Sequence, residues 1–305
     1  FLVQKKGEVM TVATSPDIQF PKLVVASSSL AARFKSTPSV QGCHTPAHLY
    51  HRFPEPSCSQ LKCLRESPQE FYWRYVRGEA PPKSSEALTY GSLLHSWGEL
   101  GESVFWPRVV RPADSLVTAA GAFSAKAQAW IESLEPDQIP LCPADEAKLR
   151  PQTKALLANP EVQRILADTV DAEFNCRWKF EGNPVRCRVD GATREFFYDW
   201  KTTRDKNPQR TWFRSVLDYG YHLQSALYGD CAEALGYAPH RMRFIVTSTV
   251  WPYECFVCVL PHRLIDNGRR ECVRLLNELQ SRLEWDCWHR LDAQDVCELY
   301  CPDWA

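Results

Sequence analysis

The feature that most constrains this chain is a strict two-residue alternation that begins near residue 174. Four apolar residues there alternate with polar ones: Phe174, Cys176, Trp178 and Phe180. This is the period of a half-buried β-strand. Turn residues at 182–184 follow, and the alternation resumes over 185–190, so these segments predict an antiparallel hairpin. A third strand is expected over 196–201, and a sheet at the centre of the chain needs helices to cover it.

The segments on either side of these strands supply the helices. Upstream, helical patterns occur at 46–50, from Ser57 or Ser59 onward, from Pro68 onward, over 87–100 and, with breaks, over 124–168. Downstream, the expected elements are a helix over 209–235, strands over 242–250 and 253–260, and a helix over 264–283. This order predicts an α/β fold in which a mixed central β-sheet is flanked by helices, with an N-terminal helical region.

The first part of the chain differs from the rest in composition and periodicity. Residues 1–44 mix Ser, Pro, Thr and Lys without sustained periodicity, which predicts a disordered segment or a linker. We expect one domain over residues 45–305, made of a mainly helical part over 45–168 and an α/β core over 169–305.

Composition excludes several classes of protein. The 36 basic and 37 acidic residues give a net charge of -1, which excludes a polycationic coat but allows a local basic cleft. No apolar run approaches the roughly 20 residues that cross a bilayer, and no secretory signal is evident, so a cytoplasmic protein without a membrane partner is expected. The thirteen cysteines are an odd number, and free thiols in a reducing compartment account for them best.

Three charged residues near the hairpin carry the first chemical signal. Asp199 and Lys201 lie two apart on the third strand, so both side chains project from one face while Trp200 points to the other. Asp190 ends the preceding strand and reaches Asp199 if the hairpin closes in register. Two adjacent carboxylates attract a divalent cation, and hard oxygen ligands suit Mg²⁺ or Mn²⁺. A metal beside a lysine favours water activation and stabilises a phosphorane-like transition state.

An ordinary structural role is the alternative for these residues. Asp190-Gly191 is common turn sequence, and Asp199 with Lys201 also matches a surface salt bridge. The apolar run 196–198 argues for a central strand, however, and a buried strand seldom carries two charges without a site that uses them.

A second signal lies on the helix that follows. Gln224 and Tyr228 are four residues apart and share one helix face with Tyr221, although an ordinary amphipathic helix gives the same pattern. Between the two signals lie five positive charges: Lys201, Arg204, Lys206, Arg210 and Arg214. A run of this kind is usually a solvated face, but beside a metal site it suits contact with DNA phosphates.

The ordered set Asp190, Asp199-x-Lys201 and Gln224-x3-Tyr228 resembles the PD-(D/E)xK nuclease superfamily, and within it the RecB-like and lambda-exonuclease-like enzymes. Further segments are similar in order and spacing to the C-terminal nuclease domain of RecE: Ser59-Gln60-Leu61, Ser67-Pro68, 71–74, 91–95, 172–173, 187–190, 199–203 and 221–224. The similarity extends from residue 45 to residue 304. Val189 stands where the family commonly has proline, and Asp199 where it commonly has glutamate, but neither change removes a ligand.

The resemblance implies a restriction-endonuclease-like fold and a Mg²⁺-dependent exonuclease that degrades linear double-stranded DNA from 5′ to 3′, in recombination, repair or phage-like DNA processing. It implies that the catalytic residues are Asp190, Asp199 and Lys201, and that two Mg²⁺ or Mn²⁺ ions bind to Asp190, Asp199, His95 and the backbone carbonyl of Trp200. Without the resemblance, His95 would more often be a hydrogen-bonded core histidine. The implied supporting or DNA-binding residues are Glu173, Gln224, Tyr228, Tyr221, Arg188, Thr202 and Arg204. The suggested partners are duplex DNA ends, further copies of the chain in a homo-oligomeric ring, and a single-strand annealing protein.

Cysteine spacing does not favour an iron–sulfur cluster, which some RecB-like nucleases hold. The late cysteines Cys287, Cys297 and Cys301 are separated by nine and three residues, unlike the compact pattern of such clusters. Cys255 and Cys258 fall on a strand at a spacing that directs their side chains to opposite faces.

Two other functions fit the same residues. One is a structure-specific endonuclease on the same core, which sequence does not separate from an exonuclease. The other is a catalytically silent DNA-binding module. The silent module is disfavoured because such a copy has no physical reason to keep three charges on a buried strand.

Overall fold

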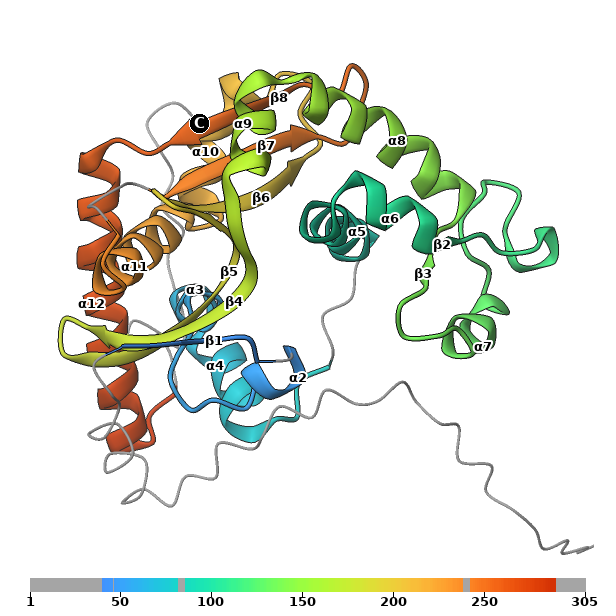
Figure 1. The fold of residues 1–305 in the computed structure, drawn as a ribbon. Helices are drawn as coiled ribbons and strands as arrows, with labels where there is room; N and C mark the ends of the chain where they lie inside the picture. The colour runs from blue at the N-terminus through green and yellow to red at the C-terminus, as the bar shows by residue number, and fades with distance from the viewer. Residues whose placement is uncertain (1–39, 46, 82–85, 238–241, 289–305) are drawn as a thin grey trace, which may run out of the picture.

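The computed structural model describes residues 40–45, 47–81, 86–237 and 242–288. Within these residues, a six-stranded sheet has the order β1-β4-β5-β6-β7-β8. Its strands are β1 (Val40–Cys43), β4 (Thr169–Phe180), β5 (Asn183–Thr193), β6 (Phe197–Thr203), β7 (Arg243–Ser248) and β8 (Cys255–Val259). The β6–β7 pair is parallel and its neighbours pair antiparallel, so the sheet is mixed. Helices lie on both sides of it (Figure 1), which confirms the predicted α/β fold.

Helices precede and follow the strand-rich part of the chain. Those before β4 are α2 (Ala47–Tyr50), α3 (Cys58–Glu66), α4 (Pro68–Phe71), the π-helical η1 (Tyr72–Arg77), α5 (Glu86–Leu100), α6 (Glu102–Arg108), the 3₁₀ turn η2 (Asp114–Leu116), α7 (Ala127–Glu132), α8 (Pro143–Ala158) and α9 (Pro160–Asp168). Those after β6 are α10 (Pro208–Asp218), α11 (Tyr221–Ala234) and α12 (His262–Trp285). A small parallel pair, β2 (Val109–Val110) and β3 (Ile139–Pro140), lies among the early helices. In the described part of the chain, no helix is long and apolar enough to span a bilayer.

Local sequence explains where α3 and α4 begin. Ser57 accepts a hydrogen bond from the backbone N–H of Gln60, and the Gln60 side chain accepts one from the backbone N–H of Ser57. This reciprocal pair is a capping box, which satisfies two amide groups that a helix start leaves open. Ser67 caps α4 in the same manner, with Pro68 at the first helical position. The predicted start at Ser57 is therefore confirmed.

The sheet separates two apolar cores. The first packs the predicted alternating residues of β4 and β5 against α3, α11 and α12; its members include Phe174, Cys176, Trp178, Phe180, Val185, Cys187 and Val189. The second joins α5, α8 and α9 to the other side of β6 and β7. Phe197 belongs to the first core and Trp200 to the second, because side chains alternate along a strand. The strand β6 is thus buried on both faces, as its apolar sequence predicts.

Close contact between α5 and β6 depends on one glycine. A Cβ atom at Gly98 would lie 2.5 Å from Nε1 of Trp200, which is closer than any real side chain tolerates. The absence of a side chain at Gly98 therefore lets the α5 backbone rest on the indole ring. His95 lies one turn earlier on the same helix, so this contact sets how far His95 stands from β6.

Two sequence predictions need correction. The segment 209–235 is not one helix, because Gly220 adopts a left-handed conformation with φ of 62° and separates α10 from α11. Residues 1–44 were expected to be disordered or a linker, yet 40–43 form β1 and pair with β4. The sheet therefore begins before the predicted domain start at residue 45. Residues 1–39 lie outside the described residues.

Candidate active site

Asp190 and Asp199 come together where the strands β5 and β6 separate, a place that we call the fork. The strands β5 and β6 pair at two positions, Gly191 with Tyr198 and Ala192 with Phe197. Asp190 and Asp199 occupy the next position of the same register, where the ladder has ended. There the Asp190 carboxylate takes the place of a backbone acceptor, because its Oδ2 accepts a hydrogen bond of 2.8 Å from the backbone N–H of Trp200. The predicted in-register approach of the two acids is therefore confirmed.

Asp190 is buried beside a second acid, and both features disfavour its ionised form. Burial raises its pKa well above the ordinary value, and the charge of Asp199 raises it further. His95 extends from α5 and places Nδ1 3.3 Å from Oδ2 of Asp190. Burial lowers the pKa of His95, which favours the neutral imidazole at neutral pH. A neutral ring has a nitrogen lone pair to offer to a metal.

Asp199 is held from two sides. Its side chain is 3% exposed, and its Oδ1 accepts a hydrogen bond of 2.5 Å from Nε2 of Gln224 on α11. The other carboxylate oxygen forms an ion pair with Nζ of Lys201, two residues along β6. Burial works to lower the pKa of Lys201, but the charges of Asp199 and Asp190 outweigh it and raise the pKa to about 12. The lysine therefore carries a positive charge beside the two acids.

Glu173 adds a third carboxylate from β4. It has φ of 51°, a left-handed conformation that is uncommon for a residue other than glycine. Such strained backbone is concentrated at functional sites, where the rest of the fold holds it in place. Glu173 forms an ion pair with Arg188 of β5. One ligand atom from each of His95, Glu173 and Asp190 lies within 4.8 Å of the other two.

The chemistry of this donor set fits a small divalent cation. Three carboxylates converge from β4, β5 and β6, and the pKa of Asp190 is raised by burial first and then by the charges of Asp199 and Glu173. A divalent ion relieves the repulsion among these charges, and carboxylate oxygens with one imidazole suit Mg²⁺ or Mn²⁺. Gln224 orients Asp199 as an outer-shell partner orients a metal ligand. The residues present therefore match the requirements of the ion that the resemblance implies.

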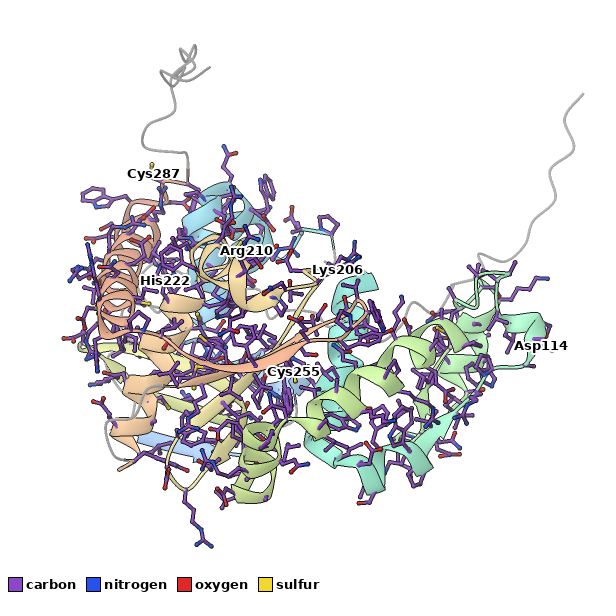
Figure 2. The ribbon with its side chains drawn as sticks, turned by 90° about the horizontal axis from the view of Figure 1, so that it is seen from above. Asp114, Lys206, Arg210, His222, Cys255 and Cys287 are labelled. Atoms are coloured by element: carbon purple, nitrogen blue, oxygen red, sulfur yellow. The ribbon has the colours of Figure 1, made fainter. Side chains whose placement is uncertain are left out.

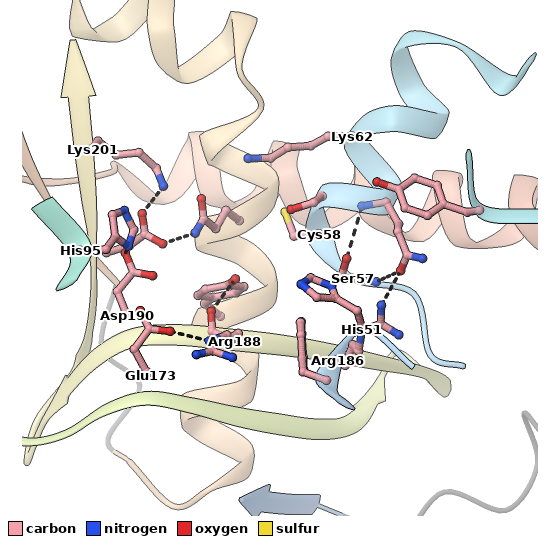
Figure 3. Close-up of a pocket in the computed structure, with 17 residues that line it drawn as sticks. His51, Ser57, Cys58, Lys62, His95, Glu173, Arg186, Arg188, Asp190 and Lys201 are labelled. Atoms are coloured by element: carbon pink, nitrogen blue, oxygen red, sulfur yellow. Dashed lines mark hydrogen bonds and ion pairs between the residues drawn. The ribbon is translucent and has the colours of Figure 1, made fainter. Parts of the chain in front are cut away.

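The acids line one side of a cavity of about 440 Å³, and α3 with the segment before it forms the other side. Figure 3 shows Glu173, Asp190 and Lys201 facing His51, Cys58 and Lys62 across this space. Four cationic side chains line the cavity: Lys62, Arg186, Arg188 and Lys201. They outnumber its three carboxylates, which belong to Glu173, Asp190 and Asp199. Burial lowers the pKa of Lys62, and no carboxylate pairs with it among the residues that the structure describes. The cavity thus suits an anionic ligand as well as a metal.

Most of the predicted site residues meet at this cavity. The cavity lining includes His95, Glu173, Arg188, Asp190, Asp199, Lys201, Gln224 and Tyr228. Tyr228 donates a hydrogen bond of 2.9 Å to the backbone carbonyl of Arg188. The ring centre of Tyr221 lies 4.9 Å from Nζ of Lys201 and 5.0 Å from Nζ of Lys62. Thr202 and Arg204 do not line the cavity, and the metal-binding role of the Trp200 carbonyl stays a prediction.

Sequence reasoning missed Lys62 and Arg186. Arg186 is 3% exposed and donates hydrogen bonds to the backbone carbonyls of Phe53 and Glu55 and to the side chain of Gln60. These bonds hold the start of α3 against β5 and so close the far wall of the cavity. The two-residue spacing of Arg186, Arg188 and Asp190 was a signal that all three share one face. Lys62 had no comparable signal, because its position depends on how α3 packs.

Three buried thiols form a second cluster that the sequence did not predict. The sulfur atoms of Cys176, Cys187 and Cys231 lie within 4.8 Å of one another inside the first core. Cys176 and Cys187 are directly paired across β4 and β5. Iron–sulfur clusters and structural zinc sites use four protein ligands, and the described residues supply three here. Cys255 and Cys258 contact different cores, so they do not share a ligand site either. Cys297 and Cys301 lie outside the described residues.

Comparison with known proteins agrees with the fold. A crystal structure from Eubacterium rectale, described as "Putative exonuclease", has a TM-score of 0.54 and 12% sequence identity, covering 81% of this chain and 90% of that chain. At this identity the likeness concerns the fold. No curated protein matches the chain. Residues 57–298 match a family described as "PDDEXK-like domain of unknown function (DUF3799)". The chain therefore belongs to this family, and its resemblance to the PD-(D/E)xK superfamily is confirmed.

Proposed function

We propose that this protein is a Mg²⁺-dependent deoxyribonuclease that hydrolyses phosphodiester bonds from the ends of linear double-stranded DNA in the 5′ to 3′ direction. The observation that carries the proposal is the meeting of Asp190, Asp199 and Lys201 at the fork between β5 and β6. These are the three motif positions of the superfamily, and they face one cavity. The family match and the nuclease described among the similar structures support the same reaction class.

The acids would hold the metal, and the fold fixes their positions. Asp190, Glu173 and His95 supply grouped donor atoms, and Asp199 stands beside them under the control of Gln224. A bound Mg²⁺ would lower the pKa of water and neutralise the charge that develops on the phosphate. The chain contributes the arrangement itself, since the carboxylates come from three different strands that the sheet holds rigidly.

Lys201 would position the attacking water and share the charge of the phosphate. Its ammonium group is tied to Asp199, which keeps it at the acidic end of the cavity. The elevated pKa keeps it protonated at neutral pH before substrate binds, so its first role is that of a hydrogen-bond donor. Lys62, across the cavity, and Arg188, beside Glu173, offer positive charge to the phosphates on either side of the scissile bond.

The direct test compares linear, nicked and covalently closed circular duplexes incubated with the full chain and Mg²⁺. We expect loss of linear DNA only, restored by Mg²⁺ or Mn²⁺ after inactivation with a chelator. Lys201→Ala and Asp199→Asn should remove the activity, while Lys179→Ala, an exposed lysine of the same sheet, should retain it. A label at the 5′ end should be released before a label at the 3′ end.

Two outcomes would favour the other functions. Nicks or breaks in the closed circle would identify a structure-specific endonuclease on the same core. DNA binding without cleavage, under every metal condition, would identify a silent binding module. The burial of Asp199, at 3% exposure, argues against the silent module because an unused buried acid lowers stability. In the same proposal, a homo-oligomeric ring and a single-strand annealing protein are the expected partners.

A further inference from the structure

The surface of α10 combines exposed aromatic side chains with positive charge. Phe213 and Tyr219 are 62% and 61% exposed, and Leu217 is 40% exposed. Exposed arginine and lysine side chains surround them. We call this set the α10 surface, and its members are Lys206, Arg210, Phe213, Arg214, Leu217 and Tyr219. Figure 2 labels Lys206 and Arg210, and both are exposed.

Helical spacing places four of these residues, Arg210, Phe213, Arg214 and Leu217, on a single face, while Lys206 precedes the helix and Tyr219 follows its end. Residues 210, 213, 214 and 217 follow the i, i+3, i+4, i+7 pattern of one helix stripe. The opposite stripe is the one that packs on the protein, through Pro208, Trp212 and Val216. The helix therefore buries one apolar stripe, as an amphipathic helix does. Its solvent side also carries the aromatic ring of Phe213 and the aliphatic side chain of Leu217. Exposed apolar groups that cluster in this way mark a binding surface.

The positive charges of this surface are largely uncompensated. Among the described residues, no carboxylate pairs with Lys206 or Arg210. Arg214 is 88% exposed and lies 3.8 Å from Asp218, a distance and exposure at which an ion pair contributes little. Asp205 accepts hydrogen bonds from Thr203 and Thr211. The charge complements a polyanion such as DNA.

The α10 surface is physically joined to the active site. Trp212 stacks on Tyr221 with ring centres 5.1 Å apart, and Tyr219 lies 5.8 Å from the same ring. Tyr221 in turn contacts the ammonium group of Lys201. The buried side of α10 and the ring of Tyr219 therefore contact a tyrosine that borders Lys201.

We propose that the α10 surface binds single-stranded DNA, with Phe213 and Tyr219 stacked on unpaired bases and Arg210 and Arg214 on the adjoining phosphates. Aromatic stacking requires bases that are not already stacked in a duplex, which selects the unpaired strand. This inference rests on the proposed function, because a nuclease that removes one strand of a duplex leaves its complement single-stranded. It adds to that function a second contact with the nucleic acid outside the catalytic cavity.

The test measures binding by fluorescence anisotropy in the presence of a chelator, which prevents cleavage. Three labelled ligands are compared: a single strand, the same strand with abasic sites throughout, and a blunt duplex. Phe213→Ala and Tyr219→Ala should each raise the Kd for the normal single strand about tenfold. They should leave the Kd for the abasic strand unchanged, because that ligand has phosphates but no bases. Arg210→Ala and Arg214→Ala should weaken binding of both strands. Each should also reduce the slope of log Kd against the logarithm of salt concentration by about one.

Trp285→Ala is the matched control, since Trp285 is 75% exposed at the end of α12 and should not affect binding. Equal loss on normal and abasic strands, or no loss at all, would overturn the inference. So would sedimentation showing that Phe213→Ala converts an oligomer to a monomer, because the surface would then contact a second copy of the chain. If the wild type cleaves DNA but Phe213 is neutral, only this inference fails. If the wild type neither binds nor cleaves DNA, the proposed function fails with it.

Discussion

Gln224 of α11 donates a hydrogen bond of 2.5 Å to Oδ1 of Asp199 on β6. Both side chains are buried, at 6% and 3% exposure respectively. The Gln224 amide fixes one oxygen of the Asp199 carboxylate, and the other oxygen forms the ion pair with Lys201. Helix α11 therefore controls the orientation of an acid on a strand to which it is not adjacent in sequence.

Removal of this amide should weaken metal-dependent activity without unfolding the protein. Gln224→Ala frees Asp199 to rotate, and the loss of an outer-shell partner costs about 10–100-fold in metal affinity or activity. The measurement is a Mg²⁺ titration of nuclease activity. Ser225→Ala is the control, because the Ser225 hydroxyl on the same helix is buried and has no hydrogen-bond partner among the residues that the structure describes. A Gln224→Ala protein with an unchanged titration curve would contradict the orienting role.

Asp190→Asn should raise the stability of the metal-free protein at neutral pH. Burial and the charge of Asp199 raise the pKa of Asp190, so ionising this carboxyl in the folded state costs free energy. The neutral amide removes that cost and can still accept the hydrogen bond from Trp200. We expect Tm to rise by about 1–2 °C, the shift that about 1 kcal/mol produces in a chain of 305 residues.

Added Mg²⁺ should then distinguish the two proteins. Wild-type Tm should increase with the ion, and Asp190→Asn should show little increase because it has lost a ligand. Asp218→Asn, at an exposed position, serves as the control. A lower Tm for metal-free Asp190→Asn than for the wild type would refute the strain that the clustered acids imply.

Two glycines of α5 should respond in opposite ways to alanine. Gly98→Ala places a methyl group against the Trp200 indole, so we expect a loss of about 1–3 kcal/mol in unfolding free energy and lower activity as His95 moves. Gly91→Ala meets no atom within 4 Å and should stabilise the helix by about 0.5–1 kcal/mol. Denaturant unfolding of both variants measures the difference. Similar effects for the two would mean that α5 does not rest on the indole.

Tyr228→Phe should lower stability while leaving DNA affinity unchanged. Its hydroxyl donates to the backbone carbonyl of Arg188, and the side chain is 8% exposed. Loss of that bond costs about 1 kcal/mol. Thermal unfolding and DNA binding measure the two effects, with Tyr253→Phe, at a half-buried position between β7 and β8, as the control. Reduced DNA affinity at unchanged Tm would instead place the Tyr228 hydroxyl on the substrate.

The hairpin and the register of the acids could be predicted because both depend on local patterns. Two-residue alternation determines which face each side chain occupies, and the short turn between β4 and β5 fixes their pairing. The same rule places Asp199 and Lys201 together and sends Trp200 to the opposite core. The start of α3 was predictable as Ser57 or Ser59, because serine is a favoured N-cap, and the capping box in the structure selects Ser57.

The remaining features depend on tertiary structure. Lys62 reaches the cavity because α3 packs across the sheet, and nothing in its own sequence neighbourhood indicates that. Glu173 has a backbone conformation that a strand pattern does not predict for a glutamate. The break at Gly220 was a missed local signal, since glycine within a helical pattern marks an end when it adopts positive φ.

The separation of β5 from β6 after two paired residues ties the chemistry to the shape of the whole sheet. Asp190 moves with the β4–β5 arm and Asp199 with the β6–β7 arm, so the gap between the acids varies with the angle at which the arms diverge. Substitutions far from the cavity that change this angle would alter the distance between the two acids, although every catalytic side chain remained intact.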